Sequence, residues 1–197
     1  MYKLFNKWSF EGINVGDPGL TKYINLDPVI IPLSGGRHAD TQFHKSNVSI
    51  VERLMNKIVV SGHNRKKHKR TSGHMTGKKQ KAMNLLKESF KIIEEKLDEN
   101  PIKVLTKAVE KSAPREEIIT IEYGGARYPQ AVECSPQRRI DLALRWIAQG
   151  SYSDSFKSNN DYEKCLAKEI IAAYNEDRNS NAISKKFNLE RQADSAR

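Results

Sequence analysis

Apolar residues recur at helical spacing in several separate segments of the chain. A first helix is predicted over residues 47–61, because its apolar residues follow the i, i+3, i+4, i+7 pattern of an amphipathic helix: Val51, Leu54, Met55 and Ile58. Gly62 follows as its expected end. A second helix is predicted where one apolar stripe runs between lysine and glutamate faces, through Ala82, Leu86, Phe90, Ile93 and Leu97.

The pair Asn100-Pro101 predicts the start of a third helix. An asparagine side chain accepts hydrogen bonds from free backbone amides, and proline has no amide to leave unpaired at the first helical position. This helix buries Leu105, Ala108 and Val109 and ends before Pro114.

Residues 118–134 have a different pattern, with β-branched and aromatic residues on both sides of Gly124-Gly125. Two adjacent glycines allow the positive φ angles of a tight hairpin turn, so a β-hairpin is predicted at about 117–134. Pro129 lacks one hydrogen-bond donor, which a sheet tolerates only at an edge. We therefore expect the hairpin to project from the body.

Three more helices are expected in the C-terminal third. Ser135-Pro136 predicts a fourth helix that ends at Gly150 and buries Ile140, Ala143, Leu144 and Ile147. A fifth helix follows the cluster at 159–161, with an inner side formed by Tyr162, Cys165, Leu166, Ile170 and Ala173. A sixth, less regular helix is predicted over about 180–193.

The first 46 residues have little periodicity and many glycines and prolines, so they predict an extended N-terminal arm with one short helix near 20–24. The expected fold is mainly α: a six-helix bundle with a protruding β-hairpin arm and an extended basic N-terminal arm. At 197 residues, 1–197 is expected to form one domain, with the arm at 1–46 and the helical body at 47–197.

The basic charge is concentrated in one segment. Residues 60–81 hold eight Lys and Arg and no Asp or Glu, whereas the rest of the chain has 26 basic and 24 acidic residues. A hydrophobic content of 38% and a mean hydropathy of -0.69 also indicate a polar surface. A polyanionic partner is favoured over a solvated tail or a localisation signal, because the segment lies between two predicted helices.

Several other classes of function are disfavoured. No apolar run approaches the roughly 20 residues of a transmembrane helix, and charged residues interrupt the first twenty positions, so neither a membrane span nor a secretory signal is expected. Cys134 and Cys165 are far apart in sequence, which predicts free thiols in the cytoplasm. No nucleophile has a base at motif spacing, so no catalytic residues and no cofactor are expected.

Two local patterns are candidates for a metal site and a phosphate-binding loop. His63, His68 and His74 lack acidic or cysteine neighbours that would neutralise a cation, so no metal is expected. The glycines beside Arg37 and His38 favour a backbone contact with RNA over a nucleotide-binding loop.

Arg138 and Arg139 occupy the first turn of the predicted fourth helix, where the helix dipole disfavours cations. An external phosphate would relieve this conflict, and an ion pair with Glu133 or Asp141 is the competing explanation. In the hairpin, Tyr123, Arg127 and Tyr128 flank the turn and would suit contact with RNA, although the two tyrosines can equally pair across the strands. An ordinary solvated face is an adequate explanation of Arg53 and Lys57.

The order of many short motifs resembles that of a known family. These are Lys7-Trp8, Asp17 with Leu20, Tyr23-Ile24, SGGRHA at 34–39, IVERL at 50–54, Gly77-Lys78-Lys79, Asn100-Pro101, Pro114-Arg115-Glu116, Gly124-Gly125, QAV at 130–132, SPQRR at 135–139, Leu166-Ala167, Asn181-Ala182 and Lys185-Lys186. Each motif is weak alone, but together they span nearly the whole chain. The chain resembles ribosomal protein seven of the small subunit, in its archaeal or eukaryotic-type form.

The resemblance implies a primary binder of small-subunit ribosomal RNA that nucleates folding of the 3′ major, or head, domain. It also implies neighbouring ribosomal proteins as partners, a cytoplasmic location on the ribosome, and a hairpin close to exit-site tRNA and mRNA. No membrane and no small-molecule substrate are expected. The expected RNA contacts are Arg37, His38, Lys45, Arg53, Lys57, Arg65, Lys66, Lys67, Lys69, Arg70, Lys78, Lys79, Arg127, Tyr128, Arg138, Arg139, Lys185 and Lys186.

Two other functions are compatible with the sequence. An architectural DNA-binding protein with β-ribbon arms would have similar charge and a similar hairpin. An RNA-modifying enzyme would require a site that the sequence does not reveal. The internal basic segment and the glycine-arginine arm favour irregular folded RNA over a regular duplex.

Overall fold

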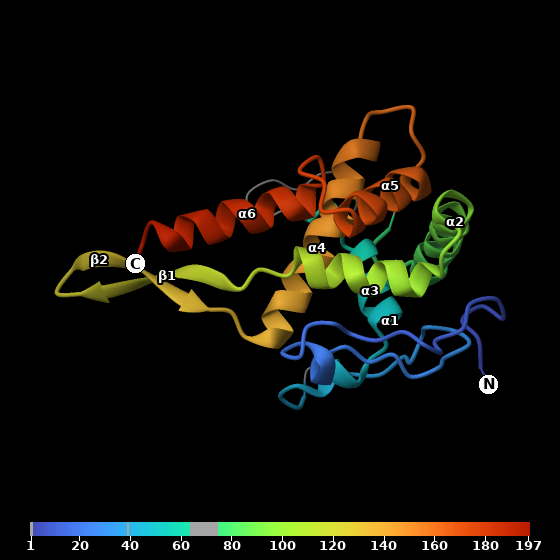
Figure 1. Ribbon diagram of the computed structural model, residues 1–197, viewed down its shortest axis with the longest axis horizontal. Coiled ribbons are helices and arrows are strands. Elements are labelled where there is room, and N and C mark those ends of the chain that lie inside the picture. Colours follow the sequence, from blue (N-terminus) through green and yellow to red (C-terminus); the bar gives the residue numbers. More distant parts are fainter. Residues whose placement is uncertain (1, 39, 64–74) are drawn as a thin grey trace.

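The computed structural model describes residues 2–38, 40–63 and 75–197 (Figure 1). Within these residues the expected fold is confirmed: six α-helices and one two-stranded antiparallel hairpin. The elements are α1 Ile50–Ile58, α2 Lys79–Leu97, α3 Pro101–Ser112, β1 Glu116–Tyr123, β2 Ala126–Glu133, α4 Pro136–Ser155, α5 Tyr162–Tyr174 and α6 Asn181–Asp194. Two short 3-10 turns, η1 Thr21–Tyr23 and η2 His44–Asn47, precede them.

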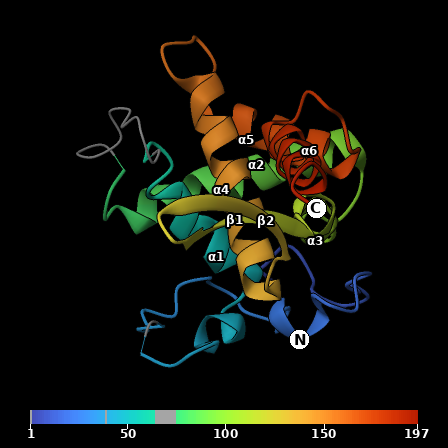
Figure 2. The ribbon, with the colours of Figure 1, turned by 90° about the vertical axis from the view of Figure 1, so that its left-hand side faces the viewer.

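Helix α5 lies at the centre of the body and contacts α2, α3 and α4. Its inner residues are fully buried, because three helices cover the apolar stripe: Leu166, Ala167, Ile170 and Ala173. Helix α1 packs against α2 and α4, and α6 packs against α4 and the hairpin. As a result, α1 and α6 lie on opposite sides of α4 (Figure 2).

The helix starts agree with the sequence in part. The Asn100 side chain accepts a hydrogen bond from the Ile102 amide at 3.0 Å, and Pro101 is the first residue of α3. Ser180 caps α6 in the same way through the Ile183 amide. Ser135, in contrast, makes no side-chain capping bond, although Pro136 does begin α4.

The prediction that Gly150 ends the fourth helix is wrong, because α4 continues to Ser155. Gly150 is needed instead for close packing between helices. A Cβ atom at this position would lie 2.8 Å from the Asn181 Cβ and 3.1 Å from the Glu169 Cδ. The absent side chain therefore allows α5 and the start of α6 to approach α4 directly.

Residues 2–38 and 40–46 contain no α-helix, but they are folded onto the body instead of extending freely. Five of their apolar side chains are part of the main core: Leu4, Trp8, Phe10, Leu20 and Ile24. Trp8 makes an edge-to-face contact with Phe90 of α2, with ring centroids 5.6 Å apart. The segment has five Lys and Arg against four Asp and Glu, so its basic character is slight.

The hairpin projects from one end of the body, as predicted (Figure 1). Its strands pair from Glu116 opposite Glu133 to Tyr123 opposite Ala126, and Gly124 and Gly125 adopt positive φ angles in the turn. Pro129 lies opposite Thr120 in a sheet that has only edge strands, so its missing donor costs little. Helix α6 runs beside the base of the hairpin and contacts both strands.

Candidate nucleic-acid interface

Three basic side chains converge on the carboxylate of Asp141, between α1, α4 and η2. The Lys45 Nζ lies 2.7 Å from one carboxylate oxygen, and the Arg53 Nη2 and Lys57 Nζ lie 3.4 and 3.7 Å from the other. Arg53 also donates from Nη1 to the backbone oxygen of Tyr23 at 2.9 Å. Asp141 therefore connects α4 to α1 and to the N-terminal segment.

The expectation that Arg53 lies on a solvated face is wrong. Only 2% of the residue is exposed, and it is the largest fully buried side chain of the protein's described part. Burial lowers the pKa of its guanidinium, while Asp141 acts in the opposite direction. Its position allows it to support the cluster from inside, whereas Lys45 and Lys57 are partly exposed and can reach a ligand.

The cluster has more positive than negative charge. Burial opposes ionisation of Asp141, but the hydrogen bond from Lys45 and the charges of Lys57, Lys45 and Arg53 outweigh it, so the Asp141 pKa lies below its ordinary value. The pKa of Lys57 is lowered mainly by burial, with Asp141 opposing and Arg145 among the cations that add to the effect. One carboxylate thus faces several cations, and an added anion would be attracted.

A shallow cleft of about 260 Å³ opens beside this cluster. Two of the residues that line it, Phe43 and Arg145, were not predicted from the sequence. Arg145 is exposed, and Phe43 is 48% exposed and adopts a left-handed backbone with φ of 63°. Arg145 forms no ion pair with any carboxylate of the described chain. The i, i+4 spacing of Asp141 and Arg145 was the available signal, since it places both on one face of a helix.

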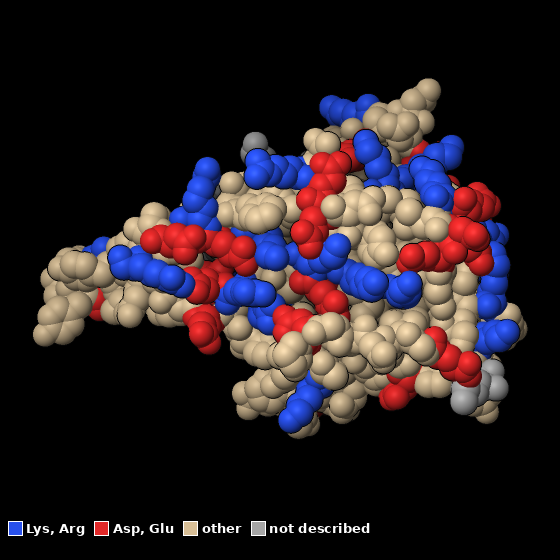
Figure 3. All heavy atoms as spheres, viewed as in Figure 1, with Lys and Arg blue, Asp and Glu red and all other residues tan. Residues whose placement is uncertain are grey.

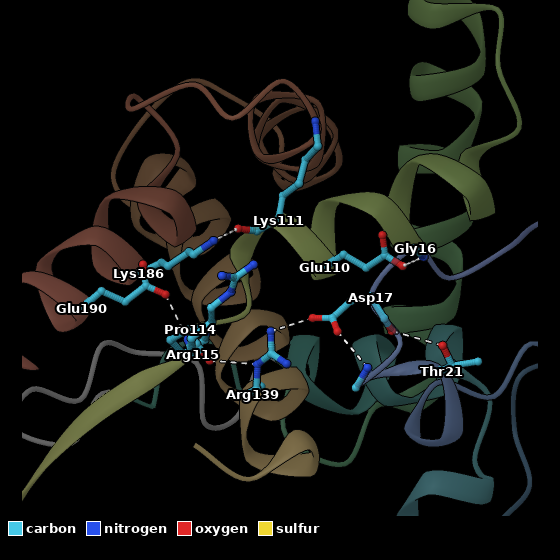
Figure 4. A network of polar contacts seen from close by, with 11 residues as sticks. Gly16, Asp17, Thr21, Glu110, Lys111, Pro114, Arg115, Arg139, Lys186 and Glu190 are labelled. Atoms are coloured by element: carbon cyan, nitrogen blue, oxygen red, sulfur yellow. Dashed lines mark hydrogen bonds and ion pairs between the residues drawn. The ribbon is translucent and has the colours of Figure 1, made fainter. Parts of the chain in front are cut away.

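Arg138 and Arg139 have internal partners that neither explanation from the sequence named. Arg138 makes two contacts with Glu117 of β1, of 2.6 Å from Nε and 2.7 Å from Nη2. Arg139 lies 2.8 Å from the Asp17 carboxylate and donates from Nε to the Pro114 oxygen at 3.0 Å (Figure 4). The unfavourable interaction of these arginines with the helix dipole at the start of α4 is thus offset by carboxylates distant in sequence, and not by Glu133 or Asp141.

The polar network of Figure 4 extends from Arg139 to the neighbouring elements. Glu110 of α3 accepts a hydrogen bond from the Gly16 amide at 2.6 Å, and Glu190 of α6 accepts one from the Arg115 amide at 2.9 Å. Because Arg115 directly precedes β1, the bond to Glu190 connects α6 to the start of the hairpin.

The glycine-rich stretch near Arg37 forms hydrogen bonds with a carboxylate of the protein itself. The backbone amide and the hydroxyl of Ser34 both donate to the carboxylate of buried Glu52, at 3.1 and 2.8 Å. His38 lies 3.2 Å from the Ser34 hydroxyl and is half-buried, whereas Arg37 is exposed. The backbone amide of Ser34, in the stretch that was expected to contact RNA, thus donates to a carboxylate of the protein itself. Arg37 remains accessible.

The hairpin tip is exposed, with 81% of Tyr123 and 57% of Tyr128 accessible. The two tyrosines do not face each other, because Tyr123 lies opposite Ala126 and Tyr128 lies opposite Ile121. Arg127 has a carboxylate neighbour, Glu122, at 3.6 Å. The side chains expected at the tip are therefore accessible, but their surroundings are not strongly basic.

The remaining candidates lie apart from the Asp141 cluster. Lys78 and Lys79 lie at the start of α2. In α6, the Lys186 Nζ donates to the Lys111 backbone oxygen at 2.8 Å, and the Lys185 Nζ lies 3.5 Å from Gln149. Five candidates lie outside the described residues, namely Arg65, Lys66, Lys67, Lys69 and Arg70, as do His68 and His74.

Charge on the face formed by α3, α6 and one side of the hairpin is mixed (Figure 3). Acidic and basic side chains alternate there, and no continuous basic surface covers it. Within residues 2–38, 40–63 and 75–197, no three His, Cys, Asp or Glu side chains are placed to hold a metal ion. No described helix is both long and apolar enough to cross a bilayer, and both cysteines are buried and free.

Together these features define a helical, basic protein in which structural polar networks accompany a surplus of cations on one side. A family model described as "Ribosomal protein S7p/S5e" matches residues 20–197. The chain belongs to this family of ribosomal proteins. Family membership gives it a structural role in the cytoplasmic ribosome and confirms that it is not an enzyme.

Two archaeal relatives match the chain over almost its full length. It is 52% identical over 195 residues to "Small ribosomal subunit protein uS7" of Nanoarchaeum equitans, covering 99% of this chain and 98% of that protein. It is 45% identical over 197 residues to the protein of the same name from Methanococcoides burtonii, covering 100% of each. These matches agree with the family resemblance seen in the sequence.

Proposed function

We propose that the chain is a primary binder of small-subunit ribosomal RNA, nucleates folding of the head domain, and lies near the tRNA exit site and the mRNA path. Its partners would be head-domain RNA, neighbouring small-subunit proteins, and tRNA and mRNA beside the hairpin. The names of the two relatives and the acid-free basic segment at 60–81 support this proposal.

One observation carries the proposal, namely the surplus of cations around Asp141. Lys45 and Lys57 share this carboxylate with buried Arg53, and Arg145 lies on the same side of α4. Exposed Phe43 lines the adjacent cleft and offers a ring on which an unpaired base can stack. Phosphates would complete the charge balance while the aromatic ring contacts a base.

Replacing Lys45 and Lys57 together by alanine tests this interface. We expect the double variant to fold, because buried Arg53 still has Asp141 as its partner. We expect the salt dependence of binding to a head-domain RNA transcript to flatten by ~0.7 to 0.9 for each phosphate that is no longer neutralised. Lys103→Ala is the matched control, since this lysine of α3 pairs with Glu99, which precedes the helix, away from the cluster. Equal slopes for the double variant and the control would refute the proposed interface.

The basic segment between α1 and α2 should bind further phosphates. Replacing Arg65, Lys66, Lys67, Lys69 and Arg70 by alanine should flatten the same slope further, by the same ~0.7 to 0.9 for each phosphate released. An unchanged slope would remove this segment from the interface.

Nucleation and position require separate measurements. Chemical probing of the head-domain transcript should show tertiary protections when this protein is the first added, and later proteins should bind only afterwards. A photoreactive side chain at Tyr123 should cross-link to tRNA or mRNA in assembled subunits, because 81% of this residue is exposed at the tip. Without early protections or tip cross-links, the corresponding part of the proposal is wrong.

Architectural DNA binding is the alternative function, since the projecting β-ribbon also suits it. A competition assay separates the two. Duplex DNA should fail to displace the head-domain transcript at equal concentration and salt, and efficient displacement would favour the alternative.

A further inference from the structure

The outer face of α6 has a cleft that the proposed interface does not use. Four residues recur there at i, i+3, i+4 and i+7 and therefore lie on one side of the helix: Ser184, Phe187, Asn188 and Arg191. Arg178, from the turn between α5 and α6, closes one end. Together these residues line a cleft of about 350 Å³, which is within the size range of small-ligand pockets.

Phe187 is not explained by packing. The buried residues of α6 are Ala182, Ile183 and Ala193, whereas Phe187 is 49% exposed. It takes part in none of the aromatic pairs found in the described chain. In a cleft with polar neighbours, such a ring can stack on a flat ligand while the polar groups orient it.

The two arginines that flank the cleft are available to an anion. Neither Arg178 nor Arg191 forms an ion pair with a carboxylate of the described residues, and the Arg191 Nη2 makes a 3.4 Å contact with Asn188. The nearest acidic residues in sequence have other partners: Asp177 accepts from the Asn179 amide, and Glu190 accepts from the Arg115 amide. The cleft therefore combines an exposed ring with positive charge.

We propose that this cleft binds an unpaired nucleotide of RNA, with its base stacked on Phe187 and its flanking phosphates beside Arg178 and Arg191. This inference rests on the proposed RNA-binding function and adds a second contact to it. Because α6 and α1 lie on opposite sides of α4 (Figure 2), the protein would bind two separate RNA segments, one on each side. Such a protein holds the two segments in a fixed relation.

Single-stranded RNA fits the cleft better than the other anionic partners. An RNA duplex keeps its bases stacked and cannot present one to Phe187. An acidic peptide would satisfy the two arginines but would leave the ring without a stacking partner. The Asn188 amide and the Ser184 hydroxyl can in addition form hydrogen bonds with a base edge or a ribose hydroxyl.

The test compares Phe187→Ala, Phe187→Leu and Phe187→Tyr in the full chain, using a twelve-nucleotide oligoadenylate and a twelve-base-pair RNA duplex as probes. Loss of stacking on one base should weaken oligoadenylate binding about ten-fold or more in the alanine variant. The leucine variant should also bind more weakly, because it restores size but not the aromatic face. The tyrosine variant should bind like the unaltered protein, and all four proteins should bind the duplex equally.

Replacing Arg178 and Arg191 by alanine gives an independent measurement. The slope of oligoadenylate affinity against salt should fall by ~0.7 for each phosphate that is no longer neutralised. The inference is overturned if the alanine variant binds oligoadenylate normally, if it loses duplex and single strand equally, or if only a hexaglutamate peptide responds to the substitutions. The Lys45 and Lys57 double variant keeps the two proposals separate, since its weakened binding to the head-domain transcript would stand even if the α6 cleft fails.

Discussion

Two groups of basic residues lie near the first turns of α4, one at its start and one around Asp141, and their surroundings differ. Arg138 and Arg139 each have a carboxylate of their own, Glu117 and Asp17. In the other group, Lys45, Arg53 and Lys57 all share the carboxylate of Asp141. The first group is balanced and joins the hairpin base to the N-terminal segment. The second has a surplus that an external anion can neutralise.

If the proposed function is correct, the ratio of cations to nearby carboxylates, and not the number of arginines, marks the surface that binds RNA. Arg138 and Arg139 are adjacent at a helix start and look like a phosphate site in the sequence. Arg53 looks like an ordinary surface residue, but it is buried and holds the second group together. Paired charges keep their internal partners, whereas surplus charges favour polyanions.

The largest expected effect is that of Asp141→Asn. This substitution leaves the Arg53 guanidinium buried without a compensating negative charge, and breaking such a pair costs about 3–5 kcal/mol of unfolding free energy. Denaturant unfolding monitored by circular dichroism measures the loss. Asp161→Asn is the control, because that carboxylate pairs only with exposed Lys164, and its removal should change stability by less than about 0.5 kcal/mol. Similar losses in the two variants would contradict the central role of Asp141.

A smaller effect is expected when the balanced group is disturbed. Arg139→Lys cannot keep both the Pro114 oxygen and the Asp17 carboxylate, because an ammonium group lacks the planar fork of guanidinium. We expect a loss of about 1.5–3 kcal/mol in unfolding free energy, with no change in the salt dependence of RNA binding. A flatter salt dependence in the Arg139→Lys variant would instead place this arginine on RNA.

The sequence was sufficient for elements whose signals are local. Asn100 caps α3 as its residue type predicts, Pro136 begins α4, and Gly124-Gly125 forms the hairpin turn. These features depend on hydrogen bonds and backbone angles within a few residues of one another.

Features that depend on distant residues could not be predicted in this way. Gly150 looks like a helix end, and only its contact distances to Asn181 and Glu169 reveal a packing role. The breaker-rich N-terminal segment hides apolar residues that enter the core without any periodic pattern. Likewise, Asp141 lies 96 residues from Lys45, so no local spacing indicates that they meet.

Acid titration extends the comparison to two carboxylates. Asp141 has cationic partners, and Glu169 has no ion pair among the described residues. The pKa of Asp141 is lowered in the folded protein, so it contributes stability above its unfolded pKa, and this contribution is lost as pH falls through the folded pKa. Burial raises the pKa of Glu169, which accepts from Ser180 and the Ala182 amide but has no ion pair among the described residues. Its contribution has the opposite sign, because protonation between its unfolded and folded pKa values favours the folded state.

Unfolding free energies measured from about pH 3 to 7 should therefore respond in opposite directions to two substitutions. Asp141→Asn should remove a decrease toward acid, and Glu169→Gln should remove a gain, each by at most about 1.4 kcal/mol per pH unit. If both variants change the pH profile in the same direction, the contrast between the two carboxylates is wrong.

The smallest expected effect separates two exposed arginines on the same helix. Both line the cleft beside Asp141, but Arg145 has no carboxylate partner in the described chain, whereas Arg138 makes two contacts with Glu117. Arg145→Ala should flatten the salt dependence of head-domain RNA binding by ~0.7 to 0.9, which is about a three-fold change in affinity between 50 and 200 mM salt. Arg138→Ala removes the same charge from the protein and should leave the slope unchanged. If both variants lowered the slope equally, net charge alone would determine binding, and the arrangement of carboxylates would have no part in selecting the RNA surface.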